Sequence, residues 1–336
     1  MLTRARLTPA VADVRRAVRE NWDAAGVKAG DLVLVACSGG PDSMALAAAA
    51  AFEGPRAGIL VGAVVVEHGL QEITAAVAEQ TAANLRNLGL SPVQVLAVKV
   101  GSDGGPEAAA RDARYAALDL ALKQSGARFV MLGHTLNDQA ETVLLGLARG
   151  AGAKSLAGMS AVGDKYLRPL LGIKRETTVA FCVDSSIEVW NDPQNLDPKF
   201  TRVRIRHQVL PLLEETLGGG VAEALARSAD QLREDASVLD ALAQSAYVVA
   251  AKVSATEIEL SIDALETEMP AVQKRVIKLA IEAVGGMTTS HHLREVSELI
   301  NDWHGQKELT LAGVRVVRMG RALKFKTTKT LKPGAC

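Results

Sequence analysis

The feature that most constrains the fold is a regular alternation of apolar runs and helical segments between residues 32 and 148. The apolar runs have the length and content of strands buried on both faces, and the segments between them read as helices. This alternation is typical of an α/β fold in which helices cover both faces of a parallel sheet. Strands are predicted at residues 32–36, 58–66, 93–100 and 129–132, and helices at residues 44–52, 73–88, 107–124 and 137–148.

Three consecutive glycines at residues 218–220 indicate where a first domain ends. After them, leucines spaced seven residues apart predict a long amphipathic helix over residues 221–252. We therefore predict an α/β domain over residues 1–217 and a mainly helical domain over residues 221–336. The second domain is expected to contain further helices at residues 271–284 and 290–302 and a short β-hairpin at residues 309–318 and 322–326.

The cysteines and the apolar stretches indicate a cytoplasmic protein. Cys37, Cys182 and Cys336 lie far apart and form no Cys-x-x-Cys pair, which disfavours a zinc site, an iron–sulfur cluster or a disulfide framework. The longest apolar stretch, near residues 59–66, is too short to span a bilayer. The first residues lack the apolar core of a signal peptide.

Charge is unevenly distributed although the formal net charge is zero. Residues 211–310 carry 8 basic against 17 acidic residues, whereas residues 311–336 carry 7 basic residues and no acidic one. A second basic segment at residues 199–207 contains Arg202, Arg204 and Arg206. Such local patches are compatible with a polyanionic partner, but a solvated face explains each of them equally simply.

The polar loop after the first predicted strand points to phosphate binding. Its glycines let the backbone approach phosphate oxygens, its serines offer hydroxyl groups, and the following helix start adds partial positive charge. It is not a Walker loop, because Gly-Lys-Ser/Thr is missing. Asp42 suits this setting if it holds a divalent metal that bridges phosphates, and a helix cap is the alternative. The loop consists of Ser38, Gly39, Gly40, Pro41, Asp42 and Ser43.

Polar clusters also follow two other predicted strands, at residues 67–69 and 133–138. Because parallel strands end at one edge of the sheet, we expect them to lie beside the phosphate loop. Asp138 and Glu141 are three residues apart, so both carboxylates lie on one helical face and are suited to a cationic substrate group. The alternatives are first-turn acids that compensate a helix dipole and, for His134, a structural histidine.

A basic cluster lies on the helix predicted at residues 107–124. Glu107, Arg111 and Arg114 are spaced to share one helical face. The functional interpretation is that the guanidinium groups bind phosphate or carboxylate, and the alternative is a solvent-facing ion pair.

The Ser-Gly-Gly-x-Asp-Ser loop resembles the PP-loop of the N-type ATP pyrophosphatases, which have a Rossmann-like sheet and split ATP into AMP and pyrophosphate while they adenylate an oxygen. With residues 107–115, 133–152 and 192–211, the chain resembles one branch of that superfamily, the tRNA(Ile)-lysidine synthases. The resemblance implies that ATP adenylates the wobble cytidine of an isoleucine tRNA with a CAU anticodon. Lysine then displaces AMP.

The resemblance also implies roles for the candidate residues. The 38–43 loop would hold ATP, with Asp42 on Mg²⁺. Arg111 and His134 would flank the reacting base and phosphate. Asp138 and Glu141 would receive the positive end of lysine. Phosphate or tRNA contacts are expected from Arg114, Arg202, Arg204 and Arg206. Whether the chain acts alone or as a homodimer is left open.

The chain departs from the family pattern at a few positions. Glu67 and Gln71 replace the more usual Asp and Arg, Thr135 replaces a frequent second His, and Asn137 replaces the first of two adjacent acids. We therefore assign the lysine site to Asp138 and Glu141 alone. The alternatives are another PP-loop adenylating enzyme, of the NAD synthetase or tRNA-thiolation kind, and a nucleotide-binding module without catalysis.

Overall fold

A computed structural model describes residues 7–67, 72–98, 106–150, 152–190, 192–254 and 257–328. The chain divides into two compact units, Met1–Gln231 and Leu232–Cys336. The division falls within a long helix, α10 (Val221–Ala250), which begins directly after the three glycines. Each unit has its own hydrophobic core and is described by itself.

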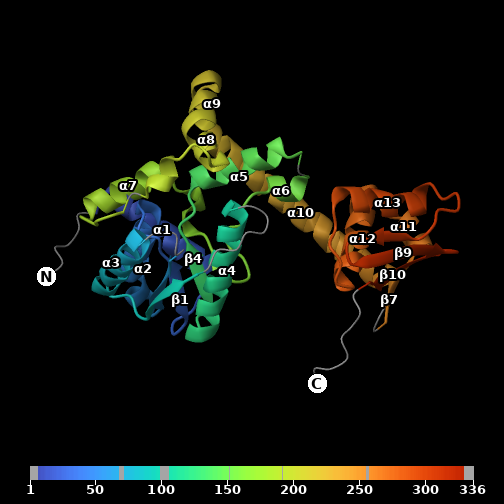
Figure 1. Cartoon of the computed structure of the whole chain (residues 1–336), viewed down its shortest axis with the longest axis horizontal. Helices are drawn as coiled ribbons and strands as arrows, with labels where there is room; N and C mark the ends of the chain where they lie inside the picture. The colour runs from blue at the N-terminus through green and yellow to red at the C-terminus, as the bar shows by residue number, and fades with distance from the viewer. Residues whose placement is uncertain are drawn as a thin grey trace. The chain divides into compact units, whose positions relative to one another are not determined.

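The first unit is built on a five-stranded sheet in the order β3-β2-β1-β4-β5, and every strand pair is parallel. Val35 of the central strand pairs with Ala63 on one side and with Met131 on the other. Figure 1 shows the strands among their helices. The predicted parallel sheet is confirmed. The strands are β1 (Leu32–Ala36), β2 (Leu60–Glu67), β3 (Val93–Ala97), β4 (Phe129–Leu132) and β5 (Tyr166–Leu167).

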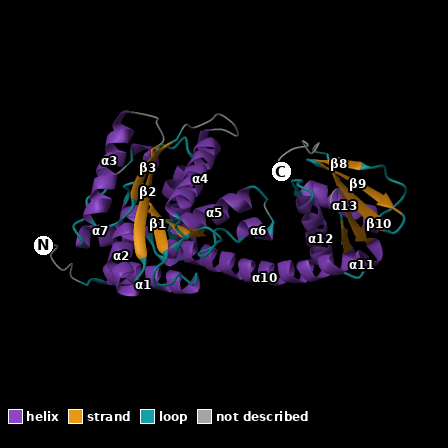
Figure 2. Cartoon of the chain, turned by 90° about the horizontal axis from the view of Figure 1, so that it is seen from below, coloured by secondary structure: helices purple, strands orange, loops and turns teal. Residues whose placement is uncertain are grey.

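Helices cover both faces of this sheet because successive side chains of a strand point to opposite faces. Val33 and Val35 join a core with four helices, whereas Leu34 and Ala36 join a second core with one helix. Figure 2 shows this arrangement around β1. The first face carries α1 (Pro9–Ala24), α2 (Pro41–Ala57), α3 (Glu72–Asn87) and α7 (Arg175–Asp184), and the second carries α4 (Pro106–Ser125).

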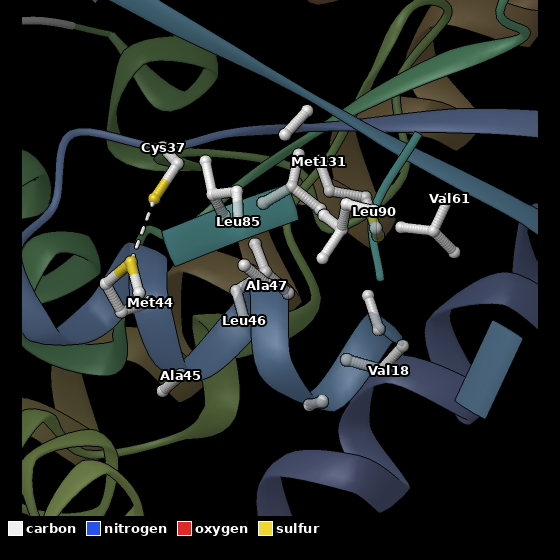
Figure 3. Packing of buried hydrophobic residues seen from close by; sticks show 14 of the residues in the cluster. Val18, Cys37, Met44, Ala45, Leu46, Ala47, Val61, Leu85, Leu90 and Met131 are labelled. Atoms are coloured by element: carbon white, nitrogen blue, oxygen red, sulfur yellow. Dashed lines mark hydrogen bonds between the residues drawn. The ribbon is translucent and has the colours of Figure 1, made fainter. Parts of the chain in front are cut away.

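The larger of these cores is closely packed around α2. Met44, Leu46 and Ala47 point from the helix toward the sheet, as Figure 3 shows. The Sγ atom of Cys37 lies 3.5 Å from the Sδ atom of Met44. α2 is longer than predicted because it begins at Pro41, so half of the phosphate loop forms its first turn.

Some of the remaining helices of the first unit meet in a small core of their own. Leu136 and Ala140 of one helix pack there with Ile205 and Leu210. The segment at Ile205–Val209 is a single π-helical turn within an otherwise α-helical stretch. The elements are α5 (Leu136–Ala148), α6 (Ala153–Leu156), η1 (Pro169–Gly172), η2 (Pro193–Leu196), α8 (Thr201–Arg204), η3 (Ile205–Val209), α9 (Leu210–Leu217) and the start of α10.

The second unit packs helices against an antiparallel sheet in the order β6-β7-β10-β9-β8. The predicted hairpin is confirmed as β9 and β10, but the segment expected as its first strand is two strands joined by a turn at Gly313. β6 and β7 were not predicted. The elements are β6 (Ala251–Val253), β7 (Glu257–Ser261), α11 (Ile262–Glu266), α12 (Pro270–Ala283), α13 (Ser290–Asn301), β8 (Leu309–Leu311), β9 (Val314–Met319) and β10 (Ala322–Thr327).

None of the helices in the described parts of the chain combines the length and the apolar character that crossing a membrane would require.

Candidate active site

The phosphate loop and the loop after β4 meet at the carboxyl edge of the sheet. β1 lies between β2 and β4, so the chain runs outward in one direction from β1 and later returns to its other side. Ligands of open α/β sheets bind at such a switch point. A Cβ atom on Gly133 would lie 3.1 Å from the amide nitrogen of Ser43 and 3.2 Å from the carbonyl oxygen of Asp42. Only glycine allows the two loops to approach so closely.

The phosphate loop is held in shape by its own hydroxyl groups and by one strained position. Ser43 Oγ accepts a hydrogen bond from the Ser38 amide at 3.2 Å and donates one to the Gly40 carbonyl at 2.9 Å. Gly39 has a φ of +84°, a conformation that favours glycine. Gly40 is the N-cap of α2 and provides no capping side chain. The first amides of α2 are therefore suited to an anion.

A cavity of about 330 Å³ opens beside this loop, between the ends of β1 and β2. Arg114 of α4 lines it and has no ion-pair partner within the described residues, and burial lowers its pKa. Glu67 and Trp190 also line it, whereas residues 68–70 lie outside the described residues. The cavity therefore combines an apolar wall with the guanidinium group of Arg114 and the carboxylates of Glu67 and Asp192, and the guanidinium group is suited to a phosphorylated ligand.

Arg111 is placed differently from Arg114. Its side chain is exposed, and its guanidinium carbon lies 5.1 Å from the centre of the Tyr115 ring. The predicted partner of these arginines, Glu107, has a side chain outside the described residues. The structure therefore brings Arg114, but not Arg111, into the cavity wall.

Asp42 points away from the cavity toward α7. Its carboxylate accepts a hydrogen bond from the Thr178 hydroxyl and lies 3.2 Å from a guanidinium nitrogen of Arg175. Burial raises the pKa of Asp42, although Arg175 and Thr178 oppose that shift. These contacts join the phosphate loop to α7. No group of three metal-ligating side chains was found in the described parts of the chain.

Asp138 is the centre of the site. One of its oxygens accepts hydrogen bonds from the Thr135 amide at 2.8 Å and hydroxyl at 2.9 Å. The other lies 3.1 Å from Arg175 and 2.9 Å from Arg206. Burial would raise the pKa of Asp138, but the Arg175 charge and the Thr135 amide outweigh it and hold this pKa below the ordinary value. Asp138 is therefore a buried but fully paired carboxylate.

Glu141 lies one helical turn further along α5 and is completely buried. Its two oxygens accept hydrogen bonds from Arg206, at 2.6 Å and 3.1 Å, and Arg202 reaches one of them at 4.0 Å. Burial raises the pKa of Glu141 despite these arginines. The result is one continuous network, which we call the carboxylate network. It runs through Asp42, Arg175, Asp138, Arg206 and Glu141.

His134 lies between the network and the end of β4. Burial lowers its pKa to about 3, so the imidazole is neutral near pH 7. Its Nδ1 atom is buried and has no hydrogen-bond partner in the structure. Buried polar atoms normally have a partner, so this nitrogen is available to a bound ligand or water molecule.

The three arginines of the basic segment have different environments. Arg206 is bound to the carboxylate network, and Arg202 donates to the Thr142 hydroxyl at 3.3 Å. Arg204 is exposed and donates to the carbonyl oxygen of Pro198 at 2.7 Å. Only Arg204 presents its side chain at an exposed position.

The sequence analysis missed Arg175 and Thr178. Arg175 is the first residue of α7, and its amide donates to the Asn137 side chain at 3.0 Å. A cation at a helix N-terminus opposes the helix dipole, so an arginine there is itself a sign that carboxylates lie nearby. Asn137, a departure from the family pattern, thus helps to position α7.

Comparisons with known proteins identify the family of the chain. A family profile described as a PP-loop domain matches residues 12–213, and a profile described as the TilS substrate binding domain matches residues 260–323. Three relatives are called tRNA(Ile)-lysidine synthase. The relative from Leifsonia xyli subsp. xyli is 53% identical, over 88% of this chain and 90% of its own. The relatives from Streptomyces coelicolor and Thermobifida fusca are 51% and 48% identical, over 88% and 91% of this chain and 85% and 94% of theirs.

A solved structure shares the fold but has a lower sequence identity to this chain. The U34-tRNA thiolase NcsA from Methanococcus maripaludis, solved with its [4Fe-4S] cluster, aligns with a TM-score of 0.57 and 18% identity. The alignment covers 67% of this chain and 80% of the thiolase.

Proposed function

The chain belongs to the tRNA(Ile)-lysidine synthase family of C–N ligases, which use ATP to form lysidine on tRNA(Ile), and we propose how its residues divide that work. ATP lies with its phosphates on the 38–43 loop and the first turn of α2. Its nucleoside occupies the cavity between β1 and β2. The carboxylate network, which joins this loop to α5 and α7, is the observation that carries the proposal.

Asp42 fits a magnesium ion in this arrangement. Mg²⁺ is commonly held by one or two carboxylates together with substrate phosphates, so a single aspartate at a phosphate loop is a suitable donor set. When bound, Mg²⁺ neutralises charge on the transferring phosphate. Arg175 would then hold Asp42 in place, because it already contacts that carboxylate from the side of α7.

The adenylation step places the cytidine oxygen at the α-phosphate of ATP. Arg114 and Arg111 stabilise negative charge on the phosphates, Arg114 from the cavity wall and Arg111 from its rim. The neutral imidazole of His134 accepts a hydrogen bond at its unpartnered Nδ1 atom from the base. The oxygen of cytidine becomes bonded to AMP, and pyrophosphate leaves.

Lysine then enters at Asp138 and Glu141, where Arg206 now lies. The guanidinium group of Arg206 already lies between the two carboxylates, which supports their proposed role as a site for a cation. Lysine binding requires Arg206 to give up at least part of its contacts, which frees it to bind phosphate. The raised pKa of Glu141 suits it to take a proton from the attacking ammonium group. Attack of the amine on C2 releases AMP.

We propose that tRNA lies against the exposed part of the basic segment, with Arg204 and Arg202 on its phosphates. Such contacts release counterions, so tRNA affinity is expected to fall steeply as salt is raised. The chemistry concerns a free nucleotide, a free amino acid and a tRNA, all available in the cytoplasm.

The proposed function is tested by incubation with ATP, labelled lysine and a CAU-anticodon tRNA, followed by nucleoside analysis and measurement of pyrophosphate. Lysidine should form only when all three substrates are present, and one pyrophosphate should be released for each lysidine. A tRNA with a different anticodon is the matched control. Pyrophosphate release without tRNA and lysine, or release that requires ammonia and a small acid instead, would contradict the proposal.

A further inference from the structure

A second cavity, of about 760 Å³, lies in the first unit among α1, α2 and α7. Both α2 and α7 begin at the active site, with Pro41 and Arg175, and they line this cavity with later residues, from Ala48 to Arg56 in α2 and with Phe181 in α7. At 1.5 Å per residue, Phe52 lies about 15 Å along α2 from Asp42. This cavity is therefore separate from the ATP site, and we call it the distal pocket.

Arginine residues dominate the polar part of the distal pocket. The guanidinium carbons of Arg15 and Arg56 lie 3.3 Å and 3.4 Å from the centre of the Phe52 ring. Arg19 pairs with Glu53 at 3.0 Å. In the part of the chain that the structure describes, neither Arg15 nor Arg56 forms an ion pair. Three arginines thus share one carboxylate in the pocket wall, which leaves an excess of positive charge.

Two buried polar atoms of the pocket have no partner. Arg15 Nε and Ser185 Oγ are inaccessible to solvent and form no hydrogen bond in the structure. Buried polar groups are nearly always hydrogen-bonded, so two unpartnered atoms on residues that line one pocket are unusual. Burial and the charges of Arg56 and Arg19 lower the pKa of Arg15, although Glu53 opposes this shift. An anion in the pocket would relieve the repulsion among these cations.

The rest of the wall is apolar. It is lined by Ala12, Ala48, Ala51, Leu88, Phe181 and Ile187. A free inorganic ion would leave this surface uncovered, whereas an RNA backbone would bring ribose but no apolar body. The volume is within the range of pockets that hold small organic ligands, roughly 300 to 1,000 Å³.

We propose that the distal pocket binds a small organic phosphate, with its phosphoryl oxygens on Arg15 and Arg56 and its apolar body on Phe181 and Ile187. A guanidinium group can bind two oxygens of one phosphate, and Arg15 and Arg56 both hold their guanidinium groups against the Phe52 ring in the pocket wall. A nucleoside diphosphate has the charge and the planar body that this wall requires. The site is independent of the roles proposed for the catalytic residues.

The test uses N-methylanthraniloyl-GDP as a fluorescent probe, titrated into the full-length protein and followed by anisotropy. Arg15→Gln and Arg56→Gln should each weaken binding by about tenfold or more, since each removes a charge-assisted contact. Arg16→Gln is the matched control, because Arg16 is the next residue on α1, is exposed, pairs with Asp13 and does not line the pocket. Its affinity for the probe should equal that of the unaltered protein.

Unchanged probe binding in Arg15→Gln and Arg56→Gln would overturn the proposal, since the probe would then lie at the ATP loop. Circular dichroism checks the fold. If Arg15→Gln unfolds, Arg56→Gln decides, because Arg56 is on the exposed end of α2. Binding of tRNA that depends on both arginines, without any binding of the probe, would also overturn the proposal and assign the pocket to RNA. Lysidine formation should be unchanged in both variants, which separates this test from that of the proposed function.

Discussion

Two arginine-rich regions of the first unit are constructed in opposite ways. In the carboxylate network, Arg175 and Arg206 each bridge two carboxylates, so little positive charge is left unpaired. In the distal pocket, Arg15 and Arg56 stack on one phenyl ring and share a single nearby carboxylate. The first region must open before a cation can enter, whereas the second is already charged for an anion. Arginine content alone therefore does not reveal what a site binds.

The largest expected difference between the two regions is in stability. Arg206→Met leaves Glu141 buried without its main partner, so the free energy of unfolding should fall by about 3 to 5 kcal/mol. Arg56→Gln in the distal pocket removes an exposed charge that has no ion-pair partner in the described residues. It should change the free energy of unfolding by about 0.5 kcal/mol or less. Urea denaturation measures both. Equal effects in the two variants would remove the distinction between paired and unpaired arginines.

The next effect concerns turnover. Asp42→Asn keeps the shape of the side chain and its contact with Thr178 but loses the charge proposed to hold Mg²⁺. We expect kcat for lysidine formation to fall by about 10²- to 10³-fold, with the melting temperature little changed. Thr178→Val is a useful companion, because it removes a hydrogen bond of Asp42 and leaves its charge. If Asp42→Asn unfolds instead, Asp42 is a structural residue.

A smaller effect is expected in the pH dependence of stability. His134 binds a proton in the unfolded chain below about pH 6.5 but remains neutral in the fold down to about pH 3. Stability is therefore lost as pH falls through this window, and between pH 6.5 and pH 4 the loss from this group is about 3 kcal/mol. His134→Gln should remove that part of the loss. The free energy of unfolding would be measured against pH for the unaltered protein and for His134→Gln. Parallel curves would show that His134 gains its proton in the folded protein at the same pH as in the unfolded chain.

The smallest effect tests the cation site directly. Glu141→Gln keeps the size of the side chain and one acceptor for Arg206, but it removes the charge proposed for lysine. The KM for lysine should rise by about tenfold, while the KM for ATP stays within a factor of two or so. Leu144, one turn further along α5, provides a control as Leu144→Met. An unchanged KM for lysine would exclude Glu141 from the lysine site.

The sequence predicted local features well because they depend on local pattern. The strands at the switch point and the closeness of the two loops follow from apolar periodicity and from the rule that parallel strands end at one edge of the sheet, whereas the helix after the phosphate loop was expected only from residue 44 and begins at Pro41. The pairing of Arg206 with Glu141 does not, because 65 residues separate them. They were assigned to different ligands, and they meet because Leu136 and Ala140 of α5 pack against Ile205 and Leu210.

Two other features could not be predicted from the local sequence pattern. Arg175 looked like an ordinary residue of a surface helix, since the aspartates it bridges come from two different loops. β6 and β7 are short, and Glu257 and Glu259 alternate with only two apolar residues in β7. Contacts between residues that are far apart in the sequence determine how these strands pair with the hairpin. A short stretch of sequence therefore cannot predict that pairing.

Gly133 has a consequence for the order in which the molecule can assemble. The phosphate loop is contacted by a residue that lies 90 positions or more further along the chain, directly after β4, and β4 pairs with β1 although three helices and two strands separate them in sequence. A nascent chain that ends before β4 would contain the entire Ser-Gly-Gly-Pro-Asp-Ser loop. It would lack Gly133, the residue that packs closely against Asp42 and Ser43 of that loop. Non-local parallel pairing of this kind is slow, so nucleotide binding should be acquired late during folding.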